Sequence, residues 1–534
     1  MHLLNFLYSL ILVVTIANTA IAKDYNIMDF GAKSDTSNIC TKAIQEAIDA
    51  CYTDGGGRVI IPAGNFKSGT IIFKDNVELH FENGAILWGS KNLYDYPGIK
   101  PKYVSLRTQG KTRQLIYAEN ASNIAISGLG EINGQGKSFK RQHREDEGVL
   151  RPHLIRFITC KNIRVQDISL KNSAAWMEHY LACEQIQIRG IKINNHCNYN
   201  NDGIDLDGCR DVTVSDVLSD SDDDGITLKS TSPRPCENIT ITNCIISSHC
   251  NAIKMGTETN GGFKNITISN CVVKPSEYAN KKSQKTCIYG KIDGITGISL
   301  EIVDGGIMDG VCFSNIRIEG THSPIFVRLA NRARTYKKET PITSIGEIKN
   351  LSLNNISIHS NKNLGCSITG IPGHPVENLQ ISNISFYQIG NGKKEDILKK
   401  IPEKEKAYPE GTMFGVLPSC GFYVRHARNI SFNGGDISMK QSDARPFFVF
   451  DDVEEGKISG LRMKNESSSE SAIWLNNSKD ILINGCKLKG SPKYLVKVSG
   501  TLSHSIYLNG NILLKETKLT LPENLLNKKV KEIK

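Results

Sequence analysis

Short runs in which apolar and polar residues alternate recur along most of the chain. In a strand, successive side chains point to opposite faces, so each run predicts a strand with one buried face. Runs of this kind return on the scale of about 20 to 50 residues, as in solenoids, where each unit buries its apolar face by stacking on its neighbours. Examples begin at Asn162, Asn238, Asn265, Asn315, Asn378 and Asn429.

The short strands, the few helical patterns and the recurring Asn and Gly corners predict an all-β fold. We expect a single-stranded right-handed parallel β-helix, with a β-propeller as the alternative. A propeller needs adjacent hairpins, and the chain shows no regular Asn-Gly or Asp-Gly hairpin turns between its strands.

Residues outside the repeats predict the ends of the β-helix and one interruption. Helical spacing over 41–51, stopped by three glycines at 55–57 and followed by a strand at 58–61, indicates an N-terminal cap within 23–75. The lysine- and glutamate-rich stretch 393–410 predicts a solvated surface insertion within 390–420, with a short helix. We assign a C-terminal cap and basic tail to 500–534, and one catalytic domain to 23–534.

The first 22 residues resemble a secretory leader. They carry an apolar run and end in Ala20-Ile21-Ala22, the small-x-small pattern of a cleavage site. We therefore expect an exported protein, periplasmic or extracellular, with a membrane anchor as the alternative. No later segment has the 18 or more apolar residues of a spanning helix.

The 534 residues carry a formal charge of +10, which suits an anionic partner: a polyuronide, a nucleic acid or an anionic lipid. The 15 cysteines are spread one per segment without a CxxC pair. Cys244 and Cys271 occupy the same place in two repeats, which favours small apolar core residues over disulfides or metal ligands.

The aspartate-rich stretch 200–230 is the strongest candidate for chemistry. Strand registers matched at 204–206, 226–228 and 253–255 place Asp205, Asp207, Thr227, Lys229 and Lys254 on one outward face. A further set of polar residues lies at the N-terminal lip of that face. These residues are Asp202, Asp223, Asp224 and Asn251.

Strands of adjacent coils lie about 4.8 Å apart, so these acids should lie within roughly 5 to 10 Å of one another. Carboxylates that close do not all ionise freely, and one of them becomes a proton donor near neutral pH. Such a group suits glycoside hydrolysis with inversion. Calcium binding is the competing use of clustered acids, but no EF-hand or nonapeptide repeat is present. Turn capping is the third interpretation, and it suits Asp211, Asp216 and Asp220.

Several motifs resemble glycoside hydrolase family 28, the polygalacturonases and rhamnogalacturonan hydrolases, over most of residues 24–460. They include DFGA with AIQEAID, GGG and IPAG near the start, GEINGQG at 130–136 and NSAAWMEH at 172–179. The most specific are NNDG at 200–203, which is similar to the family's NTDG, and the double aspartate at 223–224. The resemblance implies that Asp223 is the general acid and that Asp202 and Asp224 activate water.

Two departures from the family pattern concern substrate binding. Asn251 stands where the family has a histidine in a GHG turn, with His249 two residues earlier. Ser299-Leu300-Glu301 stands where the family's RIK motif holds uronate carboxylates. Another basic residue would replace that motif, or the sugar there would be neutral, as in rhamnogalacturonan. The predicted substrate-binding residues are His249, Asn251, Lys254, Lys229, Arg328 and Trp176. Arg332 and Arg334 are further candidates to replace the RIK motif.

The resemblance therefore implies an exported hydrolase that cleaves α-glycosidic bonds of an acidic pectic polysaccharide, with inversion and without metal or other cofactor. The expected state is a monomer, without a nucleic-acid partner. A polysaccharide lyase on the same fold is the alternative enzyme, and a carbohydrate-binding β-helix without turnover is the alternative of another class. Insertions around 276–291 and 390–418 could wall the cleft and decide between exo and endo action.

Overall fold

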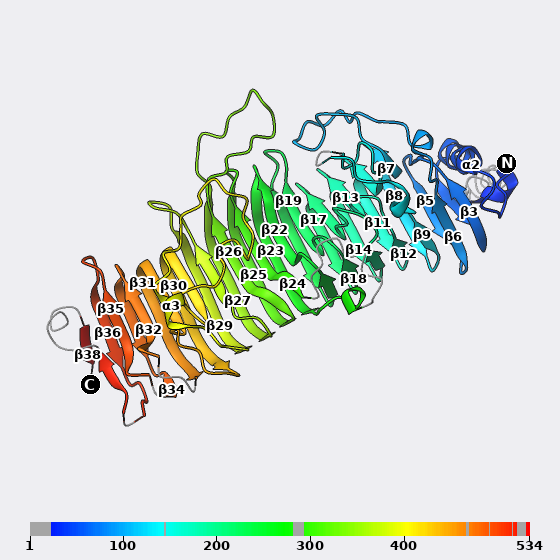
Figure 1. Ribbon diagram of the computed structural model, residues 1–534. Helices are drawn as coiled ribbons and strands as arrows, with labels where there is room; N and C mark the ends of the chain where they lie inside the picture. The colour runs from blue at the N-terminus through cyan, green and yellow to red at the C-terminus, as the bar shows by residue number, and fades with distance from the viewer. Residues whose placement is uncertain are drawn as a thin grey trace, which may run out of the picture.

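The computed structural model describes residues 23–143, 146–280, 293–465, 469–490, 492–514, 516–520 and 530–533. The predicted leader, most of the 276–291 insertion and part of the C-terminal tail lie outside these residues. The chain winds into an elongated solenoid with its two ends far apart (Figure 1). All named strands pair in parallel with the strands of the neighbouring coils, which confirms the predicted β-helix.

Three ladders of parallel strands run along the solenoid. The first ladder contains β1 (Lys23–Asn26), β2 (Gly57–Ile61), β5 (Val77–Phe81), β8 (Ser122–Gly128), β11 (Lys161–Gln166), β14 (Glu184–Arg189), β17 (Arg210–Ser215), β20 (Cys236–Thr242), β23 (Gly262–Val273), β25 (Ile307–Glu319), β27 (Glu347–Ser360), β29 (Val376–Gln388), β30 (Phe422–Met439), β31 (Phe448–Lys464), β33 (Lys479–Asn484), β36 (His504–Asn509) and β38 (Val530–Ile533).

The second ladder contains β3 (Gly64–Ser68), β6 (Ala85–Gly89), β9 (Glu131–Asn133), β12 (Ser169–Lys171), β15 (Lys192–Asn195), β18 (Leu218–Ser221) and β21 (Ile245–Ser248), with β34 (Lys487–Lys489) near the far end. From β23 onward, longer strands take its place in several coils.

The third ladder carries the functional face. It contains β4 (Ile71–Ile72), β7 (Gln114–Glu119), β10 (His153–Ile158), β13 (Glu178–Leu181), β16 (Ile204–Asp207), β19 (Ile226–Ser230), β22 (Asn251–Thr259), β24 (Gly294–Ile302), β26 (Thr321–Leu329), β28 (Cys366–Thr369), β32 (Ser471–Asn476), β35 (Tyr494–Ser499) and β37 (Lys518–Thr520).

Helices are short and lie outside the ladders. They are α2 (Thr41–Thr53), α3 (Lys394–Ile397) and the 3-10 turns η1 (Ile27–Phe30), η2 (Leu93–Asp95), η3 (Gly136–Ser138) and η4 (Glu277–Asn280). Helix α2 buries one face over the first coils, as the helical spacing over 41–51 predicts. Among the residues that the structure describes, no helix combines the length and apolar character needed to cross a membrane.

The asparagines that open the repeats explain the regular corners. Asn238 and Asn265 adopt φ of 57° and 53°, a left-handed conformation that asparagine tolerates better than most residues. Nδ2 of Asn265 donates to Oδ1 of Asn238 at 3.3 Å, and Asn429 donates to Asn378 at 2.8 Å. Side chains at equivalent corners therefore bond from coil to coil, while the alternating apolar residues fill one continuous core.

The cysteines of the described residues are free thiols, and most are buried. Cys244 and Cys271 lie in the core, as their shared place in the repeat predicts. Cys312 is exposed and Cys197 is half-buried, so not every cysteine is a core residue.

The turns that join the second ladder to the third form one edge of the solenoid, which we call the cleft edge. It comprises residues 90–113, 134–143 with 146–152, 172–177, 196–203 and 222–225, which follow β6, β9, β12, β15 and β18. Parallel stacking of these strands stacks the turns in the same order, so residues far apart in the sequence meet along this edge.

Candidate active site

The three candidate catalytic aspartates meet in one cleft of about 820 Å³ on the cleft edge. Asp202 lies in the turn after β15, and Asp223 and Asp224 lie in the equivalent turn one coil later. The amide of Asn201 fixes the first turn, because its Nδ2 donates to the carbonyl of Ser173 at 2.9 Å and its Oδ1 accepts from the backbone N–H of Cys197 at 2.9 Å.

The predicted strand registers are confirmed residue by residue. Asp205 pairs with Thr227, Thr227 pairs with Lys254, and Asp207 pairs with Lys229. Successive coils therefore present carboxylates and ammonium groups side by side on the outer face of β16, β19 and β22. This arrangement supplies the charge partners of the catalytic aspartates.

Asp224 is held in the ionised form. Its Oδ2 lies 3.0 Å from Nζ of Lys254, and its Oδ1 accepts from Nδ2 of Asn251 at 2.7 Å. Burial alone would raise the pKa of Asp224, but the charges of Lys254 and Lys229 and the Asn251 hydrogen bond together lower it below the usual value.

The surroundings of Asp202 favour its protonated form. Burial first, and then the neighbouring charges of Asp205 and Asp223, raise the pKa of Asp202 well above its ordinary value, although Lys229 opposes them from 3.8 Å. Burial likewise raises the pKa of Asp205 to about 8, against the pull of Lys229 at 3.3 Å. The pKa values of Asp202 and Asp224 are therefore shifted in opposite directions within one cleft.

Asp223 lies at the front of this pair. One oxygen of its carboxylate, Oδ1, accepts from the backbone N–H of Asp224 at 3.1 Å, and the side chain lines the cleft. Oxygen atoms of Asp223 and Asp224 and the sulfur of Cys250 lie within 4.8 Å of one another.

Trp176, Lys229 and Asn251 line the cleft, as the sequence predicts. Nζ of Lys229 lies 4.9 Å from the ring centroid of Trp176, and the guanidinium of Arg107 lies 4.7 Å from it. The tryptophan thus packs between cations, which fixes its orientation. Lys254 does not line the cleft itself and acts on it through Asp224.

The structure does not bring His249 into the cleft, contrary to its predicted place among the substrate-binding residues. The side chain is fully buried, its Nδ1 lies 2.9 Å from Oδ1 of Asp222, and its ring packs 5.0 Å from that of His196. His249 lies in the turn between β21 and β22, one coil after the turn that holds Asp222, and both side chains are buried, whereas Asp223 and Asp224 line the cleft. Ring nitrogens of His196 and His249 and an Asp222 oxygen lie within 4.8 Å of one another.

Arg328 also lies away from the cleft and is almost fully buried. Its guanidinium donates to the carbonyl oxygens of Gly370, at 3.0 Å, and of Glu403. The residue therefore anchors the insertion to the coils instead of facing substrate. Arg332 likewise pairs with buried Asp304.

The 390–420 insertion is more than the solvated surface that its charge pattern predicts. It contains the expected short helix, α3, but Tyr408 and Glu410 from its second half line the cleft. The hydroxyl of Thr257 donates to the Tyr408 hydroxyl at 3.0 Å, and Nζ of Lys254 lies 5.8 Å from the tyrosine ring. This segment forms one wall of the cleft.

Several other lining residues carry no motif that marks them in the sequence. They come from the long turns of the cleft edge, from β22 and, for Arg334, from the segment after β26, and only Arg334 is among the basic residues already considered. The charged and aromatic members are Arg107, Arg141, Glu147, Tyr199, Glu258 and Arg334. Glu258 accepts from Arg107 at 2.9 Å and lies 3.8 Å from Arg334, so part of this charge is balanced within the cleft wall.

Glu301, which stands in place of the family's RIK motif, is fully buried and does not line the cleft. The hydroxyl of Ser299 donates to it at 2.8 Å, and burial raises the pKa of Glu301 to about 7. Its charge therefore faces Lys254 and the protein interior.

The protein is a parallel β-helix with a charged cleft, and the carboxylates in this cleft have pKa values shifted in opposite directions. These features are those of a β-helical glycosidase. Residues 51–407 match the family model described as glycosyl hydrolases family 28, and the chain belongs to this family.

Individual relatives agree with the family assignment. A probable polygalacturonase of Vitis vinifera is 30% identical over 219 residues, which cover 39% of this chain and 45% of the relative. An exo-poly-alpha-D-galacturonosidase of Dickeya chrysanthemi is 29% identical over 264 residues, 40% of this chain and 43% of the relative. A probable rhamnogalacturonase A of Aspergillus oryzae is 27% identical over 217 residues, 40% and 41% of the two chains. Each match thus spans less than half of the relative's length.

Solved structures confirm the fold. A hyperthermoactive exopolygalacturonase from Thermotoga maritima superposes with a TM-score of 0.58 at 22% identity, over 69% of this chain and 88% of that chain. The family 28 exopolygalacturonase of Yersinia enterocolitica superposes with a TM-score of 0.57 at 19% identity, over 84% of this chain and 78% of that chain.

Proposed function

We propose that the protein is an exported glycosidase that hydrolyses an α-glycosidic bond beside galacturonate in a pectic polysaccharide, with inversion. The observation that carries the proposal is the convergence of Asp202, Asp223 and Asp224 on one cleft, where Nζ of Lys254 lies 3.0 Å from Asp224. The names of the relatives support the substrate class, since they are polygalacturonases and a rhamnogalacturonase.

In the proposed mechanism, Asp223 protonates the glycosidic oxygen as the bond to the leaving sugar breaks. Asp224, ionised beside Lys254, accepts a proton from the water that attacks the anomeric carbon from the opposite face. Asp202 retains its proton and hydrogen-bonds that water or the sugar, so the pair Asp202 and Asp224 carries one negative charge. A single displacement of this kind inverts the anomeric configuration.

The basic side chains of the cleft suit an acidic substrate. The guanidinium of Arg141 lies 4.3 Å from the ring centroid of Tyr199, which presents a cation and an aromatic face together at the cleft wall. Arg107, Lys229 and Arg334 add further positive charge. We assign the uronate carboxylate to this basic wall, in place of the RIK motif that the chain lacks.

Both homogalacturonan and rhamnogalacturonan remain candidate polymers, because the cleft combines basic residues with the neutral surfaces of Trp176, Tyr199 and Tyr408. The wall formed by residues near 408–410 favours entry from one end of the polymer, and we propose exo action. Export follows from the leader-like residues 1–22.

The decisive experiment incubates the purified protein with polygalacturonate and, separately, with rhamnogalacturonan, and follows the first products by NMR. We expect saturated products that appear first as the β-anomer from an α-linked polymer, and their loss in Asp223→Asn. An unsaturated product absorbing in the near ultraviolet would identify a lyase instead. Binding of the glycan without release of reducing ends by the wild-type protein would identify a binding protein.

A further inference from the structure

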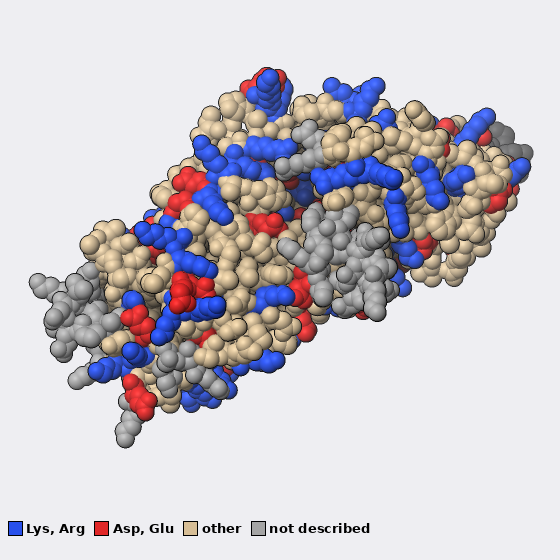
Figure 2. Space-filling model, viewed as in Figure 1, with Lys and Arg blue, Asp and Glu red and all other residues tan. Residues whose placement is uncertain are grey.

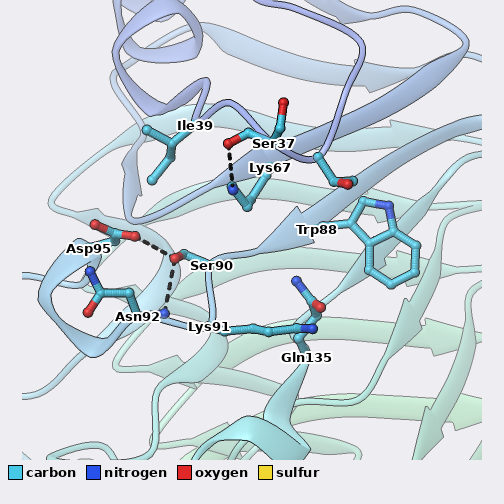
Figure 3. Close-up of a pocket in the computed structure, with 10 residues that line it drawn as sticks. Ser37, Ile39, Lys67, Trp88, Ser90, Lys91, Asn92, Asp95 and Gln135 are labelled. Atoms are coloured by element: carbon cyan, nitrogen blue, oxygen red, sulfur yellow. Dashed lines mark hydrogen bonds between the residues drawn. The ribbon is translucent and has the colours of Figure 1, made fainter.

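A second groove, of about 700 Å³, lies at the N-terminal end of the solenoid (Figure 3). It is bounded by the loop before α2, by β3 and β6, and by the turns that follow β6 and β9. Trp88 forms one side, and the Lys67, Lys91 and Gln135 side chains lie around the same space. Asp95 is the acidic lining residue, and its carboxylate accepts a hydrogen bond from Ser90.

Hydrogen bonds hold the polar side chains of this groove in place. The indole Nε1 of Trp88 donates to Oδ1 of Asn65 at 3.0 Å, so the ring is fixed across the strand edge while it stays half-exposed. Nζ of Lys67 donates to the carbonyl of Ser37 at 3.1 Å, and Nε2 of Gln135 donates to the carbonyl of Gly89 at 2.5 Å. A ligand would meet groups that already have defined positions, which lowers the entropic cost of binding.

The groove lies on the cleft edge, in line with the active site. Strands β6, β9, β12, β15 and β18 are successive neighbours in the second ladder. Trp88 is the second-last residue of the first of these strands, β6, and Asp223 follows the last, β18. Four strand spacings of about 4.8 Å separate them, roughly 19 Å along the axis, which a polymer can span and a single sugar cannot.

Two turns contribute residues to both sites. The turn after β9 supplies Gln135 to the groove and Arg141 to the active-site cleft. The turn after β6 supplies Lys91 to the groove and Arg107 to the cleft.

Positive charge continues along the connecting chain. Lys137 and Lys140, which lie between Gln135 and Arg141, are exposed. Figure 2 shows a run of Lys and Arg side chains across the visible face, from the N-terminal coils toward the middle of the solenoid. A polyanion bound at both sites would therefore meet cations over the intervening distance.

We propose that the Trp88 groove is a remote binding site for an acidic glycan chain, and that the same chain reaches the active site along the cleft edge. An indole face packs against the C–H face of a sugar ring, and the ammonium groups of Lys67 and Lys91 bind uronate carboxylates. The identity of the glycan rests on the proposed function, whereas binding at the groove is measured independently of catalysis.

Binding is tested with the full chain carrying Asp223→Asn, which leaves the polymer uncut. Affinity electrophoresis in polygalacturonate gels compares this protein with versions that also carry Trp88→Ala or Lys91→Glu. We expect each change to raise the apparent Kd for the polymer by about fivefold or more, and to leave the Kd for trigalacturonate at the active site unchanged. In the otherwise native enzyme, Trp88→Ala should raise KM for the polymer and not for the trimer.

Trp474→Ala is the matched control, because Trp474 is also half-buried and hydrogen-bonded but lies near the C-terminal end. Lys91 is exposed, so Lys91→Glu tests the site without disturbing the core. Unchanged polymer affinity in both groove variants, or an equal loss in Trp474→Ala, overturns the proposal. An equal loss of binding to poly-glutamate, which has no sugar ring, also overturns it. If the native enzyme cuts no pectic polymer, the proposed function fails while the binding comparison still decides this inference.

Discussion

The turn from Ser221 to Gly225 has two sides, and neighbouring aspartates on it have different surroundings. On the cleft side, Asp224 meets the ammonium group of Lys254 and Asp223 faces the open cleft. On the inner side, Asp222 lies 2.9 Å from a ring nitrogen of His249 and 3.9 Å from one of His196.

The comparison shows that charge partners, rather than residue type, decide what a carboxylate does. Burial alone would raise the pKa of Asp222, but hydrogen bonds and charges from the two histidines lower it. Burial alone would lower the pKa of His196, but Asp220 and Asp222 raise it. In the inner cluster, the carboxylates of Asp220 and Asp222 pair with the imidazoles of His196 and His249. In the cleft cluster the pKa of Asp202 is raised and that of Asp224 is lowered, and both side chains line the open cleft. We therefore assign a structural role to the inner side of the turn and a catalytic role to the cleft side.

The largest expected effect is on the cleft side. Asp223→Asn should lower kcat by about 10² to 10⁴-fold, the usual contribution of a positioned general acid, with the melting temperature nearly unchanged. Reducing-end release and calorimetry measure the two quantities. Asp211→Asn, at an exposed corner, is the matched control and should change neither. Activity of Asp223→Asn within tenfold of wild type would remove Asp223 from the mechanism.

The next effect combines stability with pH. Lys254→Met leaves Asp224 buried without its partner, which should cost about 3 to 5 kcal/mol of unfolding free energy. Because Lys254 lowers the pKa of Asp224, its loss should raise that pKa and move the acidic limb of the kcat profile to higher pH. Denaturant unfolding and a pH–rate profile measure both. Lys264→Met, more than half exposed beside Glu237, should change neither, and an unmoved acidic limb in Lys254→Met would contradict the assignment of Asp224.

Asp222→Asn tests the inner side. It should lower the unfolding free energy by about 1.5 to 3 kcal/mol and kcat by less than about tenfold. Because the pKa of Asp222 is lowered on folding, its ionised form stabilises the folded state fully above pH 3.8. This stabilisation is lost as the pH falls through the pKa of Asp222 in the folded protein. Because the pKa of His196 is raised on folding, its protonated form stabilises the folded state fully below pH 6.5. This stabilisation is lost as the pH rises through the pKa of His196 in the folded protein.

The stability difference between wild type and Asp222→Asn should therefore be greatest between pH 3.8 and 6.5. Urea unfolding across that range measures it. If Asp222→Asn lowered kcat as much as Asp223→Asn does and left the unfolding free energy unchanged, Asp222 would have to be counted among the catalytic residues.

The smallest effect is expected at Glu301, outside the cleft. Glu301→Gln should change KM for a uronate substrate by less than about twofold, because the side chain does not line the cleft. Its raised pKa means that wild type loses stability as the pH rises from 4.5 to about 7, so the variant should gain relative stability over that interval. A marked fall in KM would show that Glu301 repels the substrate.

The coil architecture was accessible from the sequence because its determinants are local. Alternation at Ile226 and Leu228 predicts the strand, and Asn238 and Asn265 mark corners that repeat from coil to coil. Each coil contacts only its neighbours, so strand register follows from aligning one repeat with the next. The same alignment predicts that Asp202, Asp223 and Asp224 meet.

The misplaced residues share a different cause. His249 lies in a turn, whose direction the alternation of strand residues does not determine, and Arg328 is covered by the insertion that it anchors. Tyr408 reaches the cleft from the insertion around 390–418 that could wall the cleft, but the lysines and glutamates of this segment do not show which of its residues face the cleft. No local pattern encodes where a long insertion packs, because its contacts lie far away in the sequence.

The sequence by itself determined the solenoid, its apolar core and the convergence of three aspartates, since periodic local preferences add up along a stack. Only the tertiary structure decided which aspartate has a raised pKa, which has a lowered pKa and which is buried beside histidines. Those properties depend on burial and on the distance to charges from other coils and from the insertion, and both are set when the turns and the insertion pack together.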